Sequence, residues 1–422
     1  MYDQSFSKNS LGYVLQKGDF PNTTYALQQT FKETHLTRAE VIANSNFNNI
    51  PNPLTSFNLK KKVVYRLEKL ENELVIRKLC ENLKHILKLR NQGRAAIVCN
   101  LQLLLEEGIP YRVYRLDIKS FYESFSAALV KQEVDDITQL SPQSKKLLSS
   151  LLIQHSQIGG IGVPRGLSIS SVLSDLMMQD FDLFISSLEC VYFYARYVDD
   201  IIIISSSQEK QTLFLKAVTS ALPSGLELNT KTNKKKIVTA EKRVKSEAIQ
   251  PQTPLLNFDY LGYSFSVYQP KKINKQKEGA YLRVVTVGIA ETKIKKLKTR
   301  IIRSFLDFQV TNNWALLHER IKFLTQNFSV YNKKVGNKKL AGIYHSYPQV
   351  TIDSKSLKVL DEFLRNAVLS KSGKIFSKTS LKLDGSQKRK LLAQSFVRGH
   401  AGQKFIHFRP EKIKEIQQCW LN

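Results

Sequence analysis

Three aspartates at two places in the chain have the type and surroundings that metal-dependent chemistry requires. Asp199 and Asp200 are adjacent within an apolar and aromatic stretch, residues 191–205, which predicts a β-hairpin with the pair at its tip. Asp117 interrupts a second apolar stretch, where a buried carboxylate is costly unless it is paired or bound to a metal ion. Because adjacent carboxylates repel each other as they lose water, a divalent cation would resolve the conflict.

Two neighbouring strands that carry these carboxylates would suit phosphoryl transfer by two metal ions, which lie roughly 3.5–4 Å apart in such sites. We expect two Mg²⁺ ions, with Mn²⁺ as an alternative. One ion would activate the 3′-hydroxyl of a primer, and the other would stabilise the leaving pyrophosphate. Asp117 and Asp199 are expected to bridge both ions, and Asp200 to contribute more weakly.

The tetrapeptide Val-Asp-Asp-Ile occurs twice and provides an internal control. Residues 198–201 contain the pair at the predicted hairpin, whereas residues 134–137 lie among apolar residues spaced as in a helix. In the helical copy, Asp135 and Asp136 should face solvent. Only the copy between strand-forming stretches therefore predicts a metal site.

The surrounding pattern predicts both strands and helices, which would position these residues. The first 60 residues are polar and rich in asparagine, and we expect them to be irregular. Strands are predicted at 111–121 and in the hairpin 191–205, with a further strand pair at 258–268. Helices are predicted at 61–105, at 127–155, from about 167 after a loop at 158–166, and from 291 to the C-terminus.

The net charge of +28 favours a polyanionic partner, and nucleic acid is the usual one because neutralised phosphates release counterions. Residues 231–303 hold 18 basic and 5 acidic residues, so nearly half of the excess lies in a short stretch. No apolar run is long enough to span a membrane, and no basic amphipathic terminus indicates a membrane surface. The N-terminus lacks a signal-peptide pattern, and the four cysteines are expected as buried free thiols in a cytoplasmic protein.

Four segments, in this order, resemble the motifs of reverse transcriptases. YRLDIKSFYESF (114–125) is similar to motif A, VPRGLSISSVLSD (163–175) to motif B, YVDD (197–200) to motif C, and FDYLGYSF (258–265) to the segment that grips the primer. The resemblance implies an α+β right-hand polymerase with an antiparallel palm sheet and a helical thumb. It also implies synthesis of DNA from dNTPs on an RNA template.

The implied division of the chain has four parts, listed in chain order: an N-terminal extension (1–60), fingers (61–110), a palm (111–290) with a helical fingers insertion near 127–160, and a helical thumb or C-terminal region (291–422).

The resemblance implies roles for residues that would surround the incoming nucleotide. Tyr122 would lie under its sugar and exclude a ribose 2′-hydroxyl. Arg165 and Gly166 would contact the nucleotide, although the family commonly has glutamine where this chain has Arg165. Lys231 is similar to the motif D lysine near the pyrophosphate, but the run of lysines at 234–236 leaves the register open. The other implied nucleotide contacts are Arg77, Arg94 and Ile118, of which Ile118 would also bind metal.

Further residues are expected to contact nucleic acid. Ser168 and Ser171 would keep the motif B helix thin, so that a template base can approach. Helical spacing at 293–306 predicts an amphipathic helix whose basic side would track a duplex backbone. Its basic residues are Lys296, Arg300 and Arg303, and the resemblance adds Tyr197 and Gly262 to the nucleic-acid contacts. Helix packing or a solvated helix face is the alternative explanation for the serines and arginines.

The opening DQSFS (3–7) and the motif A string are similar to bacterial defence-associated reverse transcriptases of the unknown-group or abortive-infection-like kind, in particular the A component of type 3 systems. This resemblance implies an antiphage role, a structured non-coding RNA template and a second reverse transcriptase subunit as partner. A retron-like enzyme, a template-independent DNA polymerase and a non-catalytic nucleic-acid-binding scaffold remain alternatives. A permanent lysine counter-ion in the aspartate pocket would argue against catalysis.

Overall fold

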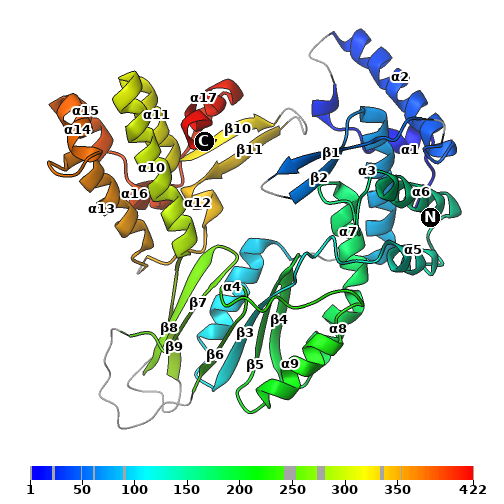
Figure 1. The fold of residues 1–422 in the computed structure, drawn as a ribbon, viewed down its shortest axis with the longest axis horizontal. Coiled ribbons are helices and arrows are strands. Elements are labelled where there is room, and N and C mark those ends of the chain that lie inside the picture. The colour runs from blue at the N-terminus through cyan, green and yellow to red at the C-terminus, as the bar shows by residue number, and fades with distance from the viewer. Residues whose placement is uncertain are drawn as a thin grey trace. The chain divides into compact units, whose positions relative to one another are not determined.

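The computed structural model describes most of the chain, and Figure 1 shows it as a ribbon. The described residues are 2–20, 24–48, 50–59, 62–88, 92–241, 253–272, 281–332, 337–352 and 354–421. The chain divides into two compact units, each made of two chain segments. Unit 1 comprises Met1–Gln92 and Tyr111–Thr239, and unit 2 comprises Gly93–Pro110 and Ala240–Asn422.

Unit 1 contains a four-stranded sheet in the order β4-β5-β3-β6. Its strands are β3 (Tyr111–Asp117), β4 (Val191–Tyr197), β5 (Asp200–Ser206) and β6 (Lys236–Ala240). β5 is antiparallel to both β3 and β4, and its four consecutive isoleucines are buried. A continuous apolar run of this kind is typical of a strand that is covered on both faces. The predicted hairpin at 191–205 is therefore confirmed.

Unit 1 also contains a hairpin, which precedes the sheet in the chain, and several helices. They are α3 (Leu70–Leu87), α5 (Ala127–Asp135), α6 (Pro142–Gln157), α7 (Ser168–Met177), α8 (Gln179–Ser187) and α9 (Gln211–Ser220), and the hairpin consists of β1 (Leu54–Leu59) and β2 (Lys62–Leu67). Ser141 caps α6 by accepting a hydrogen bond from the backbone N–H of Ser144 at 3.2 Å, and Pro142 occupies its first turn. The predicted helices at 127–155 and after 167 are confirmed, with a break at residues 136–141.

The N-terminal region is more regular than its composition predicts. It contains α1 (Lys8–Gly12), the 3₁₀ turn η1 (Lys17–Asp19) and the 20-residue helix α2 (Tyr25–Asn44). The buried residues of α2 are Leu36, Ala39, Ile42 and Ala43, all in its second half. Because its first half has no apolar stripe, the sequence gives little helical signal there. The prediction of an irregular N-terminus was wrong, as was the start of the helix at 61, where β2 lies.

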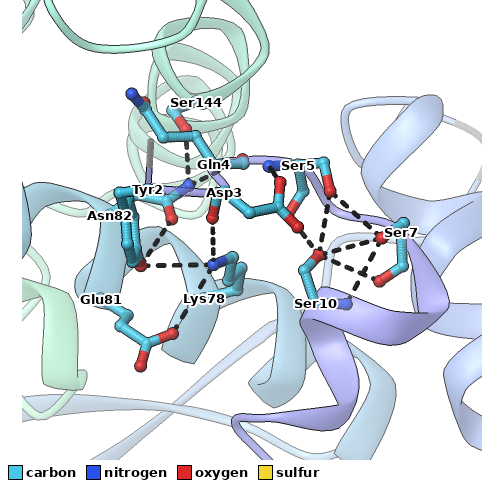
Figure 2. A network of polar contacts seen from close by, with 10 residues as sticks. All are labelled: Tyr2, Asp3, Gln4, Ser5, Ser7, Ser10, Lys78, Glu81, Asn82 and Ser144. Atoms are coloured by element: carbon cyan, nitrogen blue, oxygen red, sulfur yellow. Dashed lines mark hydrogen bonds and ion pairs between the residues drawn. The ribbon is translucent and has the colours of Figure 1, made fainter.

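Residues 2–10 are fastened to α3 and α6 by a polar network, which Figure 2 shows from close by. The ammonium of Lys78 is buried and donates to the backbone oxygen of Asp3 at 2.8 Å. The amide of Asn82 donates to the backbone oxygen of Gln4 at 3.0 Å and to Ser144 Oγ at 3.1 Å. A buried charge is stable only when such partners are present, so this segment is part of the folded body.

Unit 2 contains a second antiparallel sheet in the order β7-β8-β9. Its strands are β7 (Leu256–Tyr260), β8 (Tyr263–Lys272) and β9 (Tyr281–Ile289), and α4 (Arg94–Leu105) contacts β9. The buried guanidinium of Arg283 donates to the backbone oxygens of Glu107 and Ile109 at 3.0 and 2.7 Å. The strand pair predicted at 258–268 is confirmed.

The region after residue 290 is helical but also carries a small sheet that the sequence did not predict. Its helices are α10 (Glu291–Thr311), α11 (Trp314–Thr325), α12 (Ile343–Ser346), α13 (Ser356–Leu369), α14 (Phe376–Lys382), α15 (Gly385–Leu392), α16 (Phe396–Gly402) and α17 (Pro410–Leu421). The sheet has the order β11-β10-β12, with β10 (Asn327–Asn332), β11 (Asn337–Gly342) and β12 (Phe405–Phe408). β12 is four residues long and comes from a distant part of the chain, so no local pattern marks it.

Across the described residues, no helix has the length and apolarity that crossing a bilayer demands. The four cysteines are free thiols, of which only Cys80 is fully buried. Parts of the basic stretch 231–303, namely 242–252 and 273–280, lie outside the described residues.

Candidate active site

The register of the central strands brings Asp117 and Asp200 together. β3 and β5 are antiparallel, and the Cα of Asp117 is paired with that of Asp200 at the ends of both strands. Residues directly opposite each other in such a pair carry their side chains on the same face. Asp199 occupies the turn between β4 and β5, where its backbone oxygen accepts a hydrogen bond from Ile118 N at 3.0 Å. Asp117 thus ends its strand and faces Asp200, whereas we expected it inside the strand. The bridging of two metal ions by Asp117 and Asp199 stays a prediction.

The turn that carries Asp199 is strained and held by an arginine. Val198 has φ = 61°, a left-handed conformation that is rare for a β-branched residue. Arg196 donates to the backbone oxygen of Val198 at 3.1 Å and forms an ion pair with Asp182 at 2.7 Å. The ion pair and the neighbouring Asp175 raise the pKa of Arg196, so the guanidinium stays charged although it is almost buried. Such strain persists only where surrounding contacts determine the conformation, and it is frequent at functional sites.

The carboxylate of Asp117 is buried and already faces a cation. The residue is 2% exposed, and its Oδ1 accepts a hydrogen bond from Asn229 Nδ2 at 3.1 Å. Its Oδ2 lies 2.6 Å from Lys234 Nζ. Lys234 itself remains 40% exposed, and the contact with Asp117 raises its pKa. Nothing in the sequence distinguished Asn229 as a residue of this site.

The ionised form of the neighbouring Asp200 is disfavoured by its surroundings. Burial, followed by the charge of Asp199, raises its pKa from 3.8 to about 6. Arg115 opposes this shift weakly, since its Nη2 is 4.0 Å from Asp200 Oδ1. Three carboxylates therefore share one end of the sheet, and the nearby positive charge does not fully compensate them.

The three aspartates are chemically suited to bind divalent cations, although their carboxylates are not arranged around one cation position in this conformation. Carboxylate oxygens are the ligands that Mg²⁺ prefers, and close acidic groups with a raised pKa gain from added positive charge. Within the described parts of the chain, no three His, Cys, Asp or Glu side chains are arranged to hold a metal ion. The carboxylate of Asp117 is directed toward Asn229 and Lys234 instead. The Ile118 carbonyl stays a predicted ligand.

Tyr122 lies beside the aspartates and under an arginine. It is half-buried, and burial raises its pKa, to which the charges of Asp175 and Asp199 contribute. The guanidinium of Arg165 lies 5.0 Å from the centre of its ring and forms two hydrogen bonds, of 2.8 and 2.9 Å, with the carboxylate of Glu123. The structure therefore brings Tyr122 and Arg165 together, and their contact with a nucleotide stays a prediction.

The loop before α7 needs a glycine at position 166. Gly166 has φ = 106°, and an added Cβ would lie 2.5 Å from Val64 Cγ1 and 2.7 Å from the backbone oxygen of Tyr65. The backbone N–H of Tyr65 donates to the oxygen of Arg165 at 2.8 Å, so β2 packs directly on this loop. Ser168 and Ser171 are exposed on α7, as a contact with a template would require.

Lys234, and not Lys231, is the lysine that reaches Asp117. The side chain of Lys231 is exposed, and its backbone oxygen accepts hydrogen bonds from the N–H groups of Lys234 and Lys235 at 2.8 and 2.9 Å. This turn directs Lys234 back toward the sheet. Lys234 lies three residues after Lys231, and the predicted place of Lys231 near the pyrophosphate stays a prediction.

Two arginines that were predicted to bind the nucleotide have structural partners. Arg77 forms ion pairs with Asp19 at 2.6 Å and Glu73 at 2.8 Å. Arg94 belongs to unit 2, where its guanidinium lies over the rings of Tyr263 and Tyr347 at 4.8 and 5.4 Å. These contacts account for both side chains without a ligand.

The remaining predicted residues lie on several elements. Arg94 Nε donates to the backbone oxygen of Leu261 at 2.8 Å, in the β7–β8 turn that also contains Gly262. On α10, Lys296 is exposed, whereas Arg300 lies over the ring of Trp420 at 5.1 Å and Arg303 donates to the Trp420 oxygen at 3.0 Å. Tyr197 is 42% exposed at the end of β4.

Comparison with known proteins identifies one family. Residues 58–265 match the family model described as reverse transcriptase (RNA-dependent DNA polymerase). The matched segment contains the three aspartates, Asn229 and Lys234 and ends in β8. A search among curated proteins found no match.

Proposed function

We propose that the chain is an RNA-directed DNA polymerase whose catalysis depends on Asp117, Asp199 and Asp200, because residues 58–265 match the family model for reverse transcriptases. The family implies a nucleic-acid template and product, dNTPs as substrates and a polymerase fold, and the mixed α+β structure agrees with this. The proposal adds the residues, the metal ions and the biological context.

One observation carries the assignment of the aspartates. Asp117 and Asp200 are paired across β3 and β5, Asp199 is in the adjoining turn, and Lys234 supplies a cation to Asp117 at 2.6 Å. A purely structural role would have little use for three carboxylates at one end of a sheet, because they repel each other. A site that binds first the ammonium of Lys234 and then divalent metal ions would use all three carboxylates.

Mg²⁺ or Mn²⁺ ions bound here would activate the primer 3′-hydroxyl and stabilise the charge of the leaving pyrophosphate. Asp117, Asp199 and Asp200 would hold them, together with the carbonyl of Ile118. Asn229 keeps one oxygen of Asp117 in place by donating a hydrogen bond at 3.1 Å. Arg196 keeps the strained turn in place and thereby orients Asp199. Asn229 and Arg196 are positioning residues.

Lys234 does not have the character of a permanent counter-ion. A permanent one would be buried with its carboxylate, whereas the side chain of Lys234 is 40% exposed on a loop. Its long and flexible chain can reach solvent from its position beside Asp117. We propose that Lys234 neutralises Asp117 while metal ions are absent and swings away when they bind.

Tyr122 and Arg165 form the proposed floor for the sugar of the incoming nucleotide. The ring is half-buried, is pinned by the guanidinium at 5.0 Å and lies close enough to Asp199 for its pKa to respond. A fixed ring at this place would collide with a 2′-hydroxyl. Tyr122→Val should raise incorporation of rNTPs relative to dNTPs by at least about tenfold, equal to roughly 1.4 kcal/mol. Tyr122→Phe keeps the ring and should keep the preference.

For the biological role we propose antiphage defence, with a structured non-coding RNA as template and a second reverse transcriptase as partner. The support is the likeness of DQSFS and the motif A string to defence-associated enzymes. Sequencing of the RNA that co-purifies with the protein tests this directly. A discrete structured transcript is expected, and a random sample of cellular RNA would contradict the defence role.

Primer extension tests the catalytic proposal. Purified wild-type protein should extend a DNA primer on an RNA template with dNTPs and Mg²⁺, whereas the Asp199→Asn, Asp200→Asn double variant should not. Synthesis that persists after nuclease removal of all RNA would favour a template-independent polymerase. Tight binding of nucleic acid without any synthesis by the wild type would favour a scaffold.

A further inference from the structure

A polar cleft lies in unit 1, between the segment that follows α2 and one side of α6. Its volume is about 510 Å³, within the range of about 300–1,000 Å³ that is common for small-ligand sites. Five amide side chains and one lysine line it, together with serine and apolar groups: Asn46, Asn48, Asn52, Gln154, Gln157 and Lys146. None of the described residues that line the cleft is acidic. The lining thus suits a ligand that is neutral and polar, or anionic.

The wall made by residues 46 and 47 is rigid and strained. Asn46 and Phe47 have φ values of 51° and 63°, which is unusual for two consecutive residues without glycine. α6 holds them, because Ser150 Oγ donates to the Asn46 oxygen at 2.6 Å and Gln154 Nε2 donates to the Phe47 oxygen at 3.2 Å. Strain that is fixed in this way is frequent in ligand-binding segments.

Two hydrogen-bond acceptors in the lining have no protein partner. Gln154 is 8% exposed, and its Oε1 is buried without a hydrogen bond from the described residues. The same holds for Asn46 Oδ1. The placement of the Gln154 amide is fixed, because its nitrogen is the atom that donates to Phe47. Buried acceptors are normally satisfied, so these two oxygens point to a ligand that presents N–H donors.

We propose that this cleft binds an unpaired nucleotide of RNA, with the edge of its base against Asn46 and Gln154. Planar amides both donate and accept, which matches the edge of a base, and single-stranded RNA is recognised through bases that are turned outward. The two free acceptors favour adenine, cytosine or guanine, whose exocyclic amines donate, over uracil. Lys146, exposed at the rim, would contact a phosphate.

The cleft is distinct from the aspartate site, since it is built from the segment that follows α2 and from α6, not from β3, β5 or their turns. The inference relies on the chain being an RNA-using enzyme but not on the roles of the three aspartates. Binding can therefore be measured in the Asp199→Asn, Asp200→Asn background, where catalysis is not in question.

The experiment compares free nucleotides with RNA by fluorescence anisotropy. Fluorescent single-stranded oligoadenylate, oligocytidylate and oligouridylate are titrated with the full chain, and AMP, CMP and UMP are used as competitors. We expect the first two oligomers to bind more tightly than the third, and the mononucleotides to compete only weakly. Efficient competition by AMP at low concentration would identify a free nucleotide as the ligand and overturn the RNA proposal.

Two lining variants and two matched controls separate the cleft from general charge effects. Asn48→Ala and Lys146→Ala are exposed changes within the lining, and Asn44→Ala and Lys216→Ala are exposed changes outside it. The lining variants should each weaken oligoadenylate binding by about fivefold to tenfold, equal to roughly 1–1.4 kcal/mol, and the controls by less than about twofold. Equal losses in all four variants would show that the effect is not specific to the cleft and would overturn the proposal.

A photocrosslink gives the location without any substitution in the cleft. RNA that contains a photoreactive base should attach to peptides covering residues 46–52 or 146–157, and mass spectrometry reads the attachment site. Crosslinks confined to other segments, with binding intact, would place RNA elsewhere and overturn the proposal.

Discussion

Residues 134–137 and 198–201 have the same four amino acids, and the fold gives them opposite properties. In the first copy, Asp135 and Asp136 are exposed at the end of α5, and Lys131 pairs with Asp135 at 2.6 Å. In the second copy, Asp199 lies in a strained turn and Asp200 faces the buried Asp117. The difference shows that the surrounding fold, and not the four amino acids alone, decides whether two adjacent acids stay exposed or lie beside a third carboxylate.

The largest expected effect is on catalysis. Asp117→Asn or Asp200→Asn should lower the rate of primer extension by about a thousandfold or more, equal to roughly 4 kcal/mol, because each removes a proposed metal ligand. Asp135→Asn and Asp136→Asn should keep the wild-type rate, as measured in the same single-turnover assay. Comparable losses in both copies would break the contrast between them.

The two copies should also differ in the dependence of stability on pH. Since the pKa of Asp200 is raised to about 6, the folded protein binds this proton more tightly than the unfolded chain does. The contribution of Asp200 to the free energy of unfolding therefore decreases as pH rises from about 4 to about 6 and stays low above that window. In EDTA at pH 7, Asp200→Asn should be more stable than the wild type by about 2–3 kcal/mol, a gain that disappears near pH 4.

Denaturant unfolding at several pH values measures this profile. The Asp136→Asn protein, in which an exposed side chain is replaced, is the control. A pH-independent effect of Asp200→Asn would contradict the raised pKa and would indicate that packing, and not charge, explains the change.

The two lysine–aspartate pairs have the same length and should have unequal energies. Lys234→Met leaves a buried carboxylate without its cation and should lower the free energy of unfolding in EDTA by about 2 kcal/mol, discounted for the exposure of the lysine. Lys131→Met removes an exposed pair on a helix and should cost only about 0.3–0.5 kcal/mol.

Added Mg²⁺ should raise the melting temperature of the Lys234→Met protein more than that of the wild type, because the ion no longer competes with the ammonium. Calorimetric titration should likewise show tighter Mg²⁺ binding to this variant. If the wild type binds no Mg²⁺ and only the variant does, Lys234 is a permanent counter-ion and the scaffold alternative gains support.

The last contrast concerns the first residue of each copy, where the change at Val198 should have a small effect and the change at Val134 a large one. Val198→Asn places a residue that tolerates φ > 0 in the turn and should stabilise the protein by about 0.5–1 kcal/mol. Val134→Asn puts an amide into the core of unit 1 and should destabilise it by about 2–4 kcal/mol. Thermal unfolding measures the change in stability of each variant. Destabilisation by Val198→Asn would show that packing outweighs strain in the turn.

Local sequence patterns were sufficient to predict the strands and the turn that carry the three aspartates. The four isoleucines after Asp200, the apolar run before Asp117 and the glycine at 166 each have a direct physical meaning in the sequence, and the structure confirms the strands and the turn. The same reasoning separated Asp135 and Asp136 from the site, because apolar residues recur there at helical spacing.

Local sequence patterns could not predict the contacts between segments that are distant in the chain. Lys234, Asn229 and Arg196 reach the site through turns and ion pairs, and one lysine in a basic run cannot be told from the next without the fold. Arg77 and Arg94 were expected at a triphosphate, yet their partners Asp19 and Tyr347 are 58 and more than 200 residues away. The small sheet β10–β12 was missed for the same reason, since a four-residue strand from a remote segment leaves no periodic signal.

The order of segments has a practical consequence for dissecting the enzyme. The chain leaves unit 1 at residue 93, returns at 111 and leaves again at 240, so neither unit corresponds to one contiguous stretch of the gene. A fragment that stops at 239 would carry α4 without β9 and expose Ile97, Val98, Leu101 and Leu105 to water. Truncations at that point should give insoluble protein, and a soluble isolated unit will require excision of 93–110 and a designed linker.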